Sequence, residues 1–341
     1  MSGEALVRVA GLTVTARGRR RGDDGATIVR DVELELDRGK TLGVVGESGS
    51  GKSTVALSIL GLLGPGLHAE GSVAFDGREL LHRSEPELRP IRGAEIGAVF
   101  QNPFRSLNPS LRVGVQIRET VMLDGHERRA AEQTAIELLG QVGLPDPERA
   151  AASYPHTLSG GMQQRVAIAL SIARDPRLLI ADEPTTALDV RVQAQILELL
   201  ARLVRERDMA LILISHDLGV VASVADRIAV MYSGRVVESG PAADVFRSAA
   251  HPYSHALLES APRLRGPHGL AASLRGSATP PSVPMDGCRF APRCTFAVPR
   301  CSTNEPPLEV VDDRGHRAAC WELPWTPTAH GDAAELRKSR S

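Results

Sequence analysis

The sequence predicts an α/β protein with a largely parallel sheet that has helices on both faces. Apolar runs of strand length alternate with segments of helical spacing along most of the chain. One of these runs, residues 41–46, ends in a glycine-rich turn that opens a helical segment. With 341 residues, 42% of them hydrophobic and 24% charged, the chain is long enough for two globular domains or for one large domain with an appendage.

The expected elements follow one another in a simple order. Six runs are expected to be strands, at residues 5–14, 31–39, 41–46, 71–76, 96–101 and 177–184, and a seventh at 210–217. Helices are expected at 52–63, from Leu158 onward, at 187–207 and at 218–230, together with a mostly helical insert over 102–157. Beyond about Ser260, a linker rich in proline and glycine leads to a cysteine section and a tail over 326–341.

Charge and hydropathy exclude several classes of protein. The 40 Lys and Arg residues nearly balance the 41 Asp and Glu residues, so nucleic acid is not an expected partner. No stretch approaches 18 uninterrupted apolar residues, and the N-terminal residues lack the pattern of a signal peptide. We therefore expect a protein that stays in the cytoplasm.

The turn "GESGSGKST" matches the phosphate-loop pattern of glycine, four residues, then Gly-Lys-Ser. Glycines let successive backbone amides curl around phosphates, and the following helix directs its positive end at them. Lys52 is expected to lie along the phosphates, and the Ser53 hydroxyl to complete the shell of a bound Mg²⁺. The nucleotide-binding candidates of this turn are Gly46, Ser48, Gly49, Ser50, Gly51, Lys52, Ser53 and Thr54.

Two carboxylates follow the apolar strand of "RLLIADEP". Asp182 stands at the carboxyl end of this strand, where open parallel sheets present ligands, and it is expected to hold Mg²⁺ through water. Glu183 directly after it is placed to polarise an attacking water. The pair favours hydrolysis of a nucleoside triphosphate over transfer of its phosphoryl group to another molecule.

A third segment, "LSGGMQQR" at 158–165, starts a helix with a serine and two glycines and so offers a second anion-binding cap. Together with "GESGSGKST", "LLIADEP", "TALD" and "LISHD", it resembles the nucleotide-binding subunit of ATP-binding-cassette (ABC) transporters over about residues 5–250. The resemblance implies a P-loop NTPase (RecA-like) core with a helical ABC subdomain. A small cysteine-containing C-terminal appendage would follow it.

The resemblance also assigns roles to single residues. Two such subunits dimerise head to tail in this family, so Ser159, Gly160 and Gly161 would face the γ-phosphate of an ATP held by the opposite subunit. Gln101 matches the glutamine that senses Mg²⁺ and the attacking water. His216 matches the histidine at the γ-phosphate, and Asp189 the loop acid that touches the partner's active site. Glu183, His216 and Gln101 are therefore the expected catalytic residues, and Ser53, Gln101 and Asp182 the expected contacts of Mg²⁺.

A finer resemblance is to ATP-binding subunits of bacterial oligopeptide and dipeptide importers. It is carried by "FQNPFRSLNPSLRVGVQI", "MYSGRVVESGPAADVF", "HPYSHALLESAPRL" and the cysteine section. It implies a nucleotide-binding domain over 1–250, with its helical subdomain at about 102–157, and an importer-type C-terminal region over 251–341. The implied partners are two membrane-spanning permeases, a homologous ATPase subunit and, indirectly, an extracytoplasmic binding protein. The protein would then lie peripherally on the cytoplasmic side of the cell membrane.

The expected function is hydrolysis of ATP, with Mg²⁺, to drive import of a peptide-like solute. The alternatives are the same ATPase role for nickel or another small solute, an ABC ATPase without a membrane partner, and a regulatory module that holds ATP without hydrolysing it. One departure from the family concerns adenine. Residues 1–74 contain no Phe, Trp or Tyr on which the base could stack, so aliphatic or arginine side chains would have to support it.

The four cysteines, Cys288, Cys294, Cys301 and Cys320, all lie near the C-terminal end. Clustered cysteines in a reducing compartment indicate metal binding or catalysis before disulfides. Their spacing is wider than in common zinc sites, and four thiolates are the usual ligands of a [4Fe-4S] cluster. Some importer subunits that resemble this chain carry such a cluster there. A [4Fe-4S] cluster, reduced free thiols and zinc are the three alternatives, and none is expected to take part in hydrolysis.

Overall fold

The computed structural model describes residues 5–17, 25–186, 188–260 and 276–323. The predicted tail over 326–341 and the first part of the predicted linker lie outside these residues. The chain divides into two compact units. Unit 1 comprises the described residues within 1–6, 36–41 and 82–214, and unit 2 those within 7–35, 42–81 and 215–341. This division differs from the predicted domains 1–250 and 251–341, which stay predictions.

Unit 1 is built on parallel strands. Strand β6 (Ile96–Val99) pairs in parallel with β7 (Leu178–Asp182), which pairs in parallel with β8 (Ala210–Ser215). Every residue of β8 is buried, as is usual when helices cover both faces of a parallel sheet. Since the register places Val99 beside Ala181, the carboxyl ends of β6 and β7 lie at one edge of the sheet.

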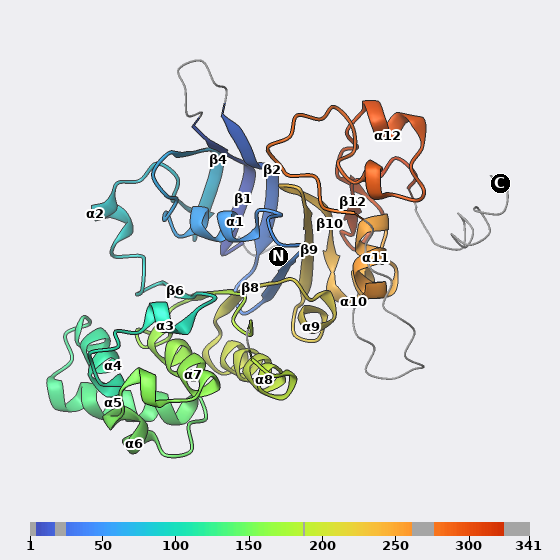
Figure 1. The fold of residues 1–341 in the computed structure, drawn as a ribbon. Helices are drawn as coiled ribbons and strands as arrows, with labels where there is room; N and C mark the ends of the chain where they lie inside the picture. Colours follow the sequence, from blue (N-terminus) through green and yellow to red (C-terminus); the bar gives the residue numbers. More distant parts are fainter. Residues whose placement is uncertain (1–4, 18–24, 187, 261–275, 324–341) are drawn as a thin grey trace. The chain divides into compact units, whose positions relative to one another are not determined.

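The helices of unit 1 include the predicted insert. The segment 102–157 forms α3 (Pro103–Ser106), α4 (Val113–Met122), α5 (Arg128–Gln141), α6 (Pro147–Ala152) and the 3-10 turn η1 (Pro155–Thr157). Helices α4, α5 and α6 pack on one another, and α4 and α5 also pack on α7 (Gly160–Ser171), as Figure 1 shows. The short α2 (Glu85–Leu88) precedes them, and α8 (Val190–Arg207) buries the stripe Ile196, Leu199, Leu200 and Leu203, which has the helical period.

Unit 2 contains an antiparallel sheet, and the sequence pattern does not distinguish its strands from those of the parallel sheet. Its strand order is β2 (Ala26–Leu36), β1 (Val7–Ala16), β4 (Leu67–Phe75) and β5 (Arg78–Glu79). Burial of Val32, Leu34 and Leu36 alternates with exposure of their neighbours in β2, as predicted for a strand with one buried face.

The phosphate-loop strand of unit 2 lies in a second group of strands. Strand β3 (Thr41–Val45) pairs in parallel with β9 (Arg227–Tyr232). Strand β10 (Arg235–Pro241) pairs with β9 and β12 (Arg317–Ala318), and β12 pairs with β11 (Glu309–Val310), all antiparallel. The remaining elements are α1 (Lys52–Ile59), α9 (Leu218–Ala222), α10 (Ala242–Arg247), α11 (Pro252–Ser260), η2 (Ala291–Arg293) and α12 (Pro299–Thr303).

The helix predicted at 218–230 is wrong in its second half. Helix α9 ends at Ala222, and β9 begins five residues later. Residues Ile228 to Met231 are fully buried between β3 and β10, and short apolar runs of this kind do not distinguish a buried strand from a helix. Within the described ranges, none of the helices combines the length and hydrophobicity needed to span a bilayer.

Candidate functional site

The phosphate loop of unit 2 joins the buried strand β3 to helix α1 through a turn that requires glycine. Gly46 has φ 154°, and a Cβ on it would lie 2.1 Å from the carbonyl oxygen of Met231. Gly51, just before the helix, has φ 99° and would place a Cβ 2.9 Å from Val29 Cγ2. These positions exclude side chains and let the backbone turn tightly.

Lys52 lies against this turn. Its Nζ donates to the carbonyl oxygens of Gly46 and Glu47, at 2.8 Å each, and it is 4% exposed. Ser48, four residues before Lys52, and Ser53, directly after it, are exposed residues. The loop thus presents an ammonium group, hydroxyls and the start of an eight-residue helix close together, which is the donor set that phosphate oxygens require.

Unit 1 brings together two residues predicted separately, Gln101 and Glu183. Gln101 follows β6, and its Nε2 donates to Glu183 Oε2 at 3.1 Å. Thr186 Oγ1 donates to the same carboxylate oxygen at 2.8 Å. Thr186 was not among the predicted site residues, because its hydroxyl reaches Glu183 through a turn that the motif does not specify.

Glu183 also has a strained backbone. Its φ is 47°, in the left-handed region that costs a residue with a side chain about 1–2 kcal/mol. Its backbone N–H donates to Ile214 O at 3.0 Å, which fixes this conformation. Asp182, half-buried, is the last residue of β7, so the two carboxylates leave the strand in succession.

The second predicted anion-binding cap has the expected geometry at the start of α7. Ser159 is its N-cap, and its Oγ accepts from the backbone N–H of Met162 at 3.4 Å. Ser159 and Gly160 are exposed. Asp189 similarly caps α8 by accepting from Val192 N at 3.0 Å, and a Cβ on Gly161 would lie 2.9 Å from Val192 Cγ1. The two helix starts therefore pack closely.

His216 belongs to unit 2 and follows β8 as an exposed residue. Its neighbour Asp217 caps α9 by accepting from Val220 N at 3.1 Å, and Asp217 N donates to Ser215 Oγ at 3.1 Å. The predicted residues thus fall into two groups. The phosphate loop and His216 lie in unit 2, and Gln101, Asp182, Glu183, the α7 cap and Asp189 lie in unit 1.

The predicted magnesium contacts carry suitable donors. The Ser53 hydroxyl, the Asp182 carboxylate and the Gln101 amide all offer oxygen, which Mg²⁺ prefers. They are divided between the two units, Ser53 in unit 2 and the other two in unit 1. When bound, Mg²⁺ would neutralise charge on the phosphates.

The four cysteines are free thiols, and Cys301 is buried. Burial raises the pKa of Cys294 to about 12 and that of Cys320 to about 11, and it also raises the pKa of Cys288. Among the residues that the structure describes, no group of three or more His, Cys, Asp or Glu side chains lies so that it could hold a metal ion. As placed, the cysteines do not fit a shared ion.

Comparison with known families gives two matches. Residues 29–186 match the ABC transporter family, and residues 237–301 match the oligopeptide/dipeptide transporter C-terminal region. The chain is similar to the oligopeptide transport ATP-binding protein OppD of Bacillus subtilis, with 46% identity over 90% of this chain and 85% of that protein. It is 45% identical to a Brucella melitensis protein whose name describes a peptide import ATP-binding protein, over 94% and 99% of the two chains.

Solved structures similar to this chain are also ABC ATPase cassettes. The ATP-binding cassette MJ0796, as a dimer in a post-hydrolysis state bound to ADP and Pi, covers 70% of this chain and 99% of its own, with 31% identity and a TM-score of 0.61. CbiO1 of Clostridium perfringens, part of the ABC transporter complex CbiONQ, covers 71% and 91% with 28% identity and a TM-score of 0.61. The chain belongs to the ATP-binding subunits of ABC transporters, in the oligopeptide/dipeptide importer branch.

Proposed function

We propose that this protein hydrolyses ATP to energise import of di- or oligopeptides through an ABC transporter. The observation that best supports hydrolysis is the hydrogen bond between Gln101 and Glu183 at the ends of adjacent parallel strands. A carboxylate held by an amide and by the Thr186 hydroxyl is oriented to accept a proton from an attacking water. The similarity to OppD and to the Brucella protein supports peptide as the solute.

In the proposed reaction, the phosphate loop and Lys52 bind the triphosphate, and a Mg²⁺ ion held by the predicted contacts would neutralise its charge. Glu183 takes a proton from the water that attacks the γ-phosphorus, and Gln101 orients that water. His216 contacts the γ-phosphate. Ser159, Gly160, Gly161 and Asp189 act on the nucleotide of a homologous subunit in a head-to-tail dimer, and the exposure of Ser159, Gly160 and Asp189 is consistent with that role.

The substitution Glu183→Gln tests this proposal because it keeps the shape of the side chain and removes the base. We expect ATP turnover to fall by about 10²- to 10⁴-fold while Mg-ATP still binds. Glu206→Gln, the same change at an exposed position of α8, is the matched control and should hydrolyse at the normal rate. Lys52→Ala should lose nucleotide binding. Undiminished hydrolysis by Glu183→Gln would remove Glu183 from the role.

We further propose that unit 1 binds the permeases through a groove between α4 and α7. The groove, of about 280 Å³, is lined by Gln116, Glu119, Thr120, Leu123 and Leu170. Leu123 is 70% exposed, so its side chain is open to contact with a partner. A cytoplasmic helix of a membrane-spanning subunit is the proposed occupant. This contact would hold the protein at the cytoplasmic face of the cell membrane, with the solute-binding protein on the other side.

Co-expression and co-purification with the two membrane-spanning subunits of its transporter test the groove. Leu123→Asp should lose the permeases and keep soluble ATP binding, because the side chain is exposed and charge there costs little folding stability. Val310→Asp, at a 67% exposed valine in β11, is the control and should retain them. If the Leu123 variant co-purifies normally, the permeases bind elsewhere.

A further inference from the structure

The C-terminal cysteine section of unit 2 contacts the phosphate loop directly. Arg293 donates from both terminal nitrogens to the Glu47 carboxylate, at 2.9 and 3.0 Å. Glu47 is the second residue of the phosphate-loop motif. Its backbone N–H donates to the hydroxyl of Tyr253, at the start of α11, at 2.9 Å. Two side chains from more than 200 residues downstream therefore hold this one residue by its side chain and its backbone.

Arg293 is held firmly in its turn. Its side chain is 6% exposed, and the guanidinium lies 5.8 Å from the centre of the Tyr232 ring and 5.9 Å from that of Phe290. It also donates to the Tyr232 hydroxyl at 3.3 Å. Burial alone would lower the pKa of Arg293, but its hydrogen bonds to Glu47 and Tyr232 outweigh burial and raise it. The guanidinium is therefore a fixed, permanently charged fork.

The aromatic rings around Arg293 form one cluster. Tyr232 and Tyr253 have ring centres 4.6 Å apart, and Phe290 lies 5.3 Å from Tyr232 and 5.4 Å from Tyr253. Rings packed at these distances are restricted in position, because each ring contacts the faces and edges of the others. The Tyr253 hydroxyl that binds Glu47 N and the Arg293 guanidinium are thus set by the same cluster.

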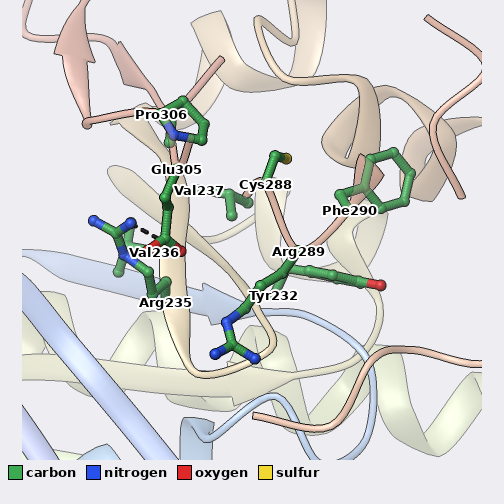
Figure 2. Close-up of a pocket in the computed structure, with 10 residues that line it drawn as sticks. Tyr232, Arg235, Val236, Val237, Cys288, Arg289, Phe290, Glu305 and Pro306 are labelled. Atoms are coloured by element: carbon green, nitrogen blue, oxygen red, sulfur yellow. Dashed lines mark ion pairs between the residues drawn. The ribbon is translucent and has the colours of Figure 1, made fainter. Parts of the chain in front are cut away.

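The segment that carries Arg293 begins and ends at a cysteine. Cys288 N donates to Cys301 O at 2.7 Å, and Cys294 N donates to Phe290 O at 3.0 Å, with η2 between them. Beside Cys288, a cavity of about 20 Å³ is bounded by Tyr232, Phe290 and the ion pair of Arg235 with Glu305, as Figure 2 shows. This volume holds about one water molecule, so the segment has little room to shift.

Glu47 also contacts Lys52, the lysine of the phosphate loop. The carbonyl oxygen of Glu47 accepts from Lys52 Nζ at 2.8 Å, and also from Ser50 N at 3.2 Å. The peptide groups on either side of Glu47 are thereby held on one side by Tyr253 and on the other by Lys52. A rotation of this residue would move the carbonyl that positions the ammonium group.

We propose that Arg293 is a positioning residue for ATP binding: through Glu47, the C-terminal cysteine section holds the phosphate loop in its nucleotide-binding shape. The inference rests on the proposed function. It assigns the C-terminal appendage a role in ATP binding, and that role depends on Arg293 and not on the thiols. Arg293 does not touch the nucleotide. It acts by limiting the conformations of Glu47, so its loss should weaken binding more than it slows the chemical step.

The variant Arg293→Met keeps an apolar side chain against the aromatic rings and removes the guanidinium group. We expect its dissociation constant for the fluorescent analogue trinitrophenyl-ATP, and its KM for ATP, to rise about tenfold, with kcat changed less than threefold. A merely structural loss would lower the active fraction and hence kcat at constant KM. Glu47→Gln should have the same effect, and the double variant should be no worse than either single one, because both remove one interaction.

Arg300→Met is the matched control. Arg300 lies in the same section, in α12, with its guanidinium 3.4 Å from the centre of the Trp321 ring, and its side chain is directed to that ring and not to the phosphate loop. Its KM should stay within twofold of the starting protein. If Arg293→Met does not fold, Arg293→Lys and Glu47→Gln carry the test, since lysine keeps the charge but cannot make the paired contact.

Normal affinity and KM in both Arg293→Met and Glu47→Gln would overturn the inference, as would equal losses in Arg293→Met and Arg300→Met. Lys52→Ala, measured alongside, separates this failure from failure of the proposed function. If Lys52→Ala loses the analogue while the Arg293 and Glu47 variants keep it, only the inference is wrong. If Lys52→Ala also binds normally, the phosphate-loop assignment itself is wrong.

Discussion

Lowering the pH from 7 to 5 should destabilise unit 2 through the buried His251. This residue precedes α11 and is 2% exposed. Its Nδ1 accepts from Tyr253 N at 3.0 Å, and its ring centre lies 5.9 Å from that of Phe290. Burial lowers the pKa of His251 to about 3, so the ring is neutral in the folded protein at all ordinary pH values.

The sign and size of the effect follow from the two pKa values. In the unfolded chain a histidine titrates near 6.5, so between pH 6.5 and 3 the unfolded state binds the proton and the folded state does not. The stabilising contribution is therefore complete above pH 6.5 and is lost as the pH falls. At 1.36 kcal/mol per pH unit, the loss between pH 7 and 5 is about 2 kcal/mol.

Urea unfolding followed by tryptophan fluorescence measures this loss, because both tryptophans, Trp321 and Trp325, lie in the C-terminal section. The comparison protein is His251→Asn, whose side-chain oxygen replaces Nδ1 as an acceptor and does not titrate. It should be less stable at pH 7 but should lose about 2 kcal/mol less between pH 7 and 5. Parallel stability curves for the two proteins would refute the reasoning, since all other groups titrate in both.

Two further predictions concern packing and the thiols. Gly97→Ala in β6 should destabilise unit 1 by about 3 kcal/mol in urea unfolding, because its Cβ would lie 2.3 Å from the carbonyl oxygen of Ser171. The control is Gly64→Ala, whose Cβ would have no atom within 4 Å. Equal stability of the two variants would contradict the predicted clash. Cys294 and Cys320, whose pKa values burial raises, should react slowly with iodoacetamide at pH 7.5 and rapidly in urea. Iron and sulfide in anaerobically purified protein would instead support the [4Fe-4S] alternative, and zinc the third one.

The local parts of the candidate site could be predicted from the sequence. The phosphate loop is nine consecutive residues, and Gly46 and Lys52 are fixed by the turn itself. Likewise, the N-cap role of Ser159 follows from a serine before two glycines and a helical segment. Contacts within such short segments depend on sequence neighbours, so a pattern of residues specifies them well.

The contact of Gln101 with Glu183 could be predicted only in part from the sequence. The residues are 82 positions apart, and they meet because β6 and β7 happen to be neighbours in the sheet. Their roles could be assigned by resemblance, but the hydrogen bond could not. Strand order also explains why the helix predicted at 218–230 is wrong in its second half. The apolar residues there fit a helix and a strand equally well, and their burial between β3 and β10 favours the strand.

The contact between the cysteine section and the phosphate loop could not be predicted from a motif. The four cysteines predicted a site separate from the ATP-binding site, and none of them belongs to the phosphate loop. The contact is made instead by Arg293, whose only sequence feature is its place next to Cys294, and by Tyr253 before the linker. Cys294 follows Arg293 directly, and its backbone N–H donates to the carbonyl oxygen of Phe290, so the turn that carries Arg293 is joined to the aromatic cluster that also holds Tyr253. The section can therefore influence nucleotide binding without supplying any group to the reaction.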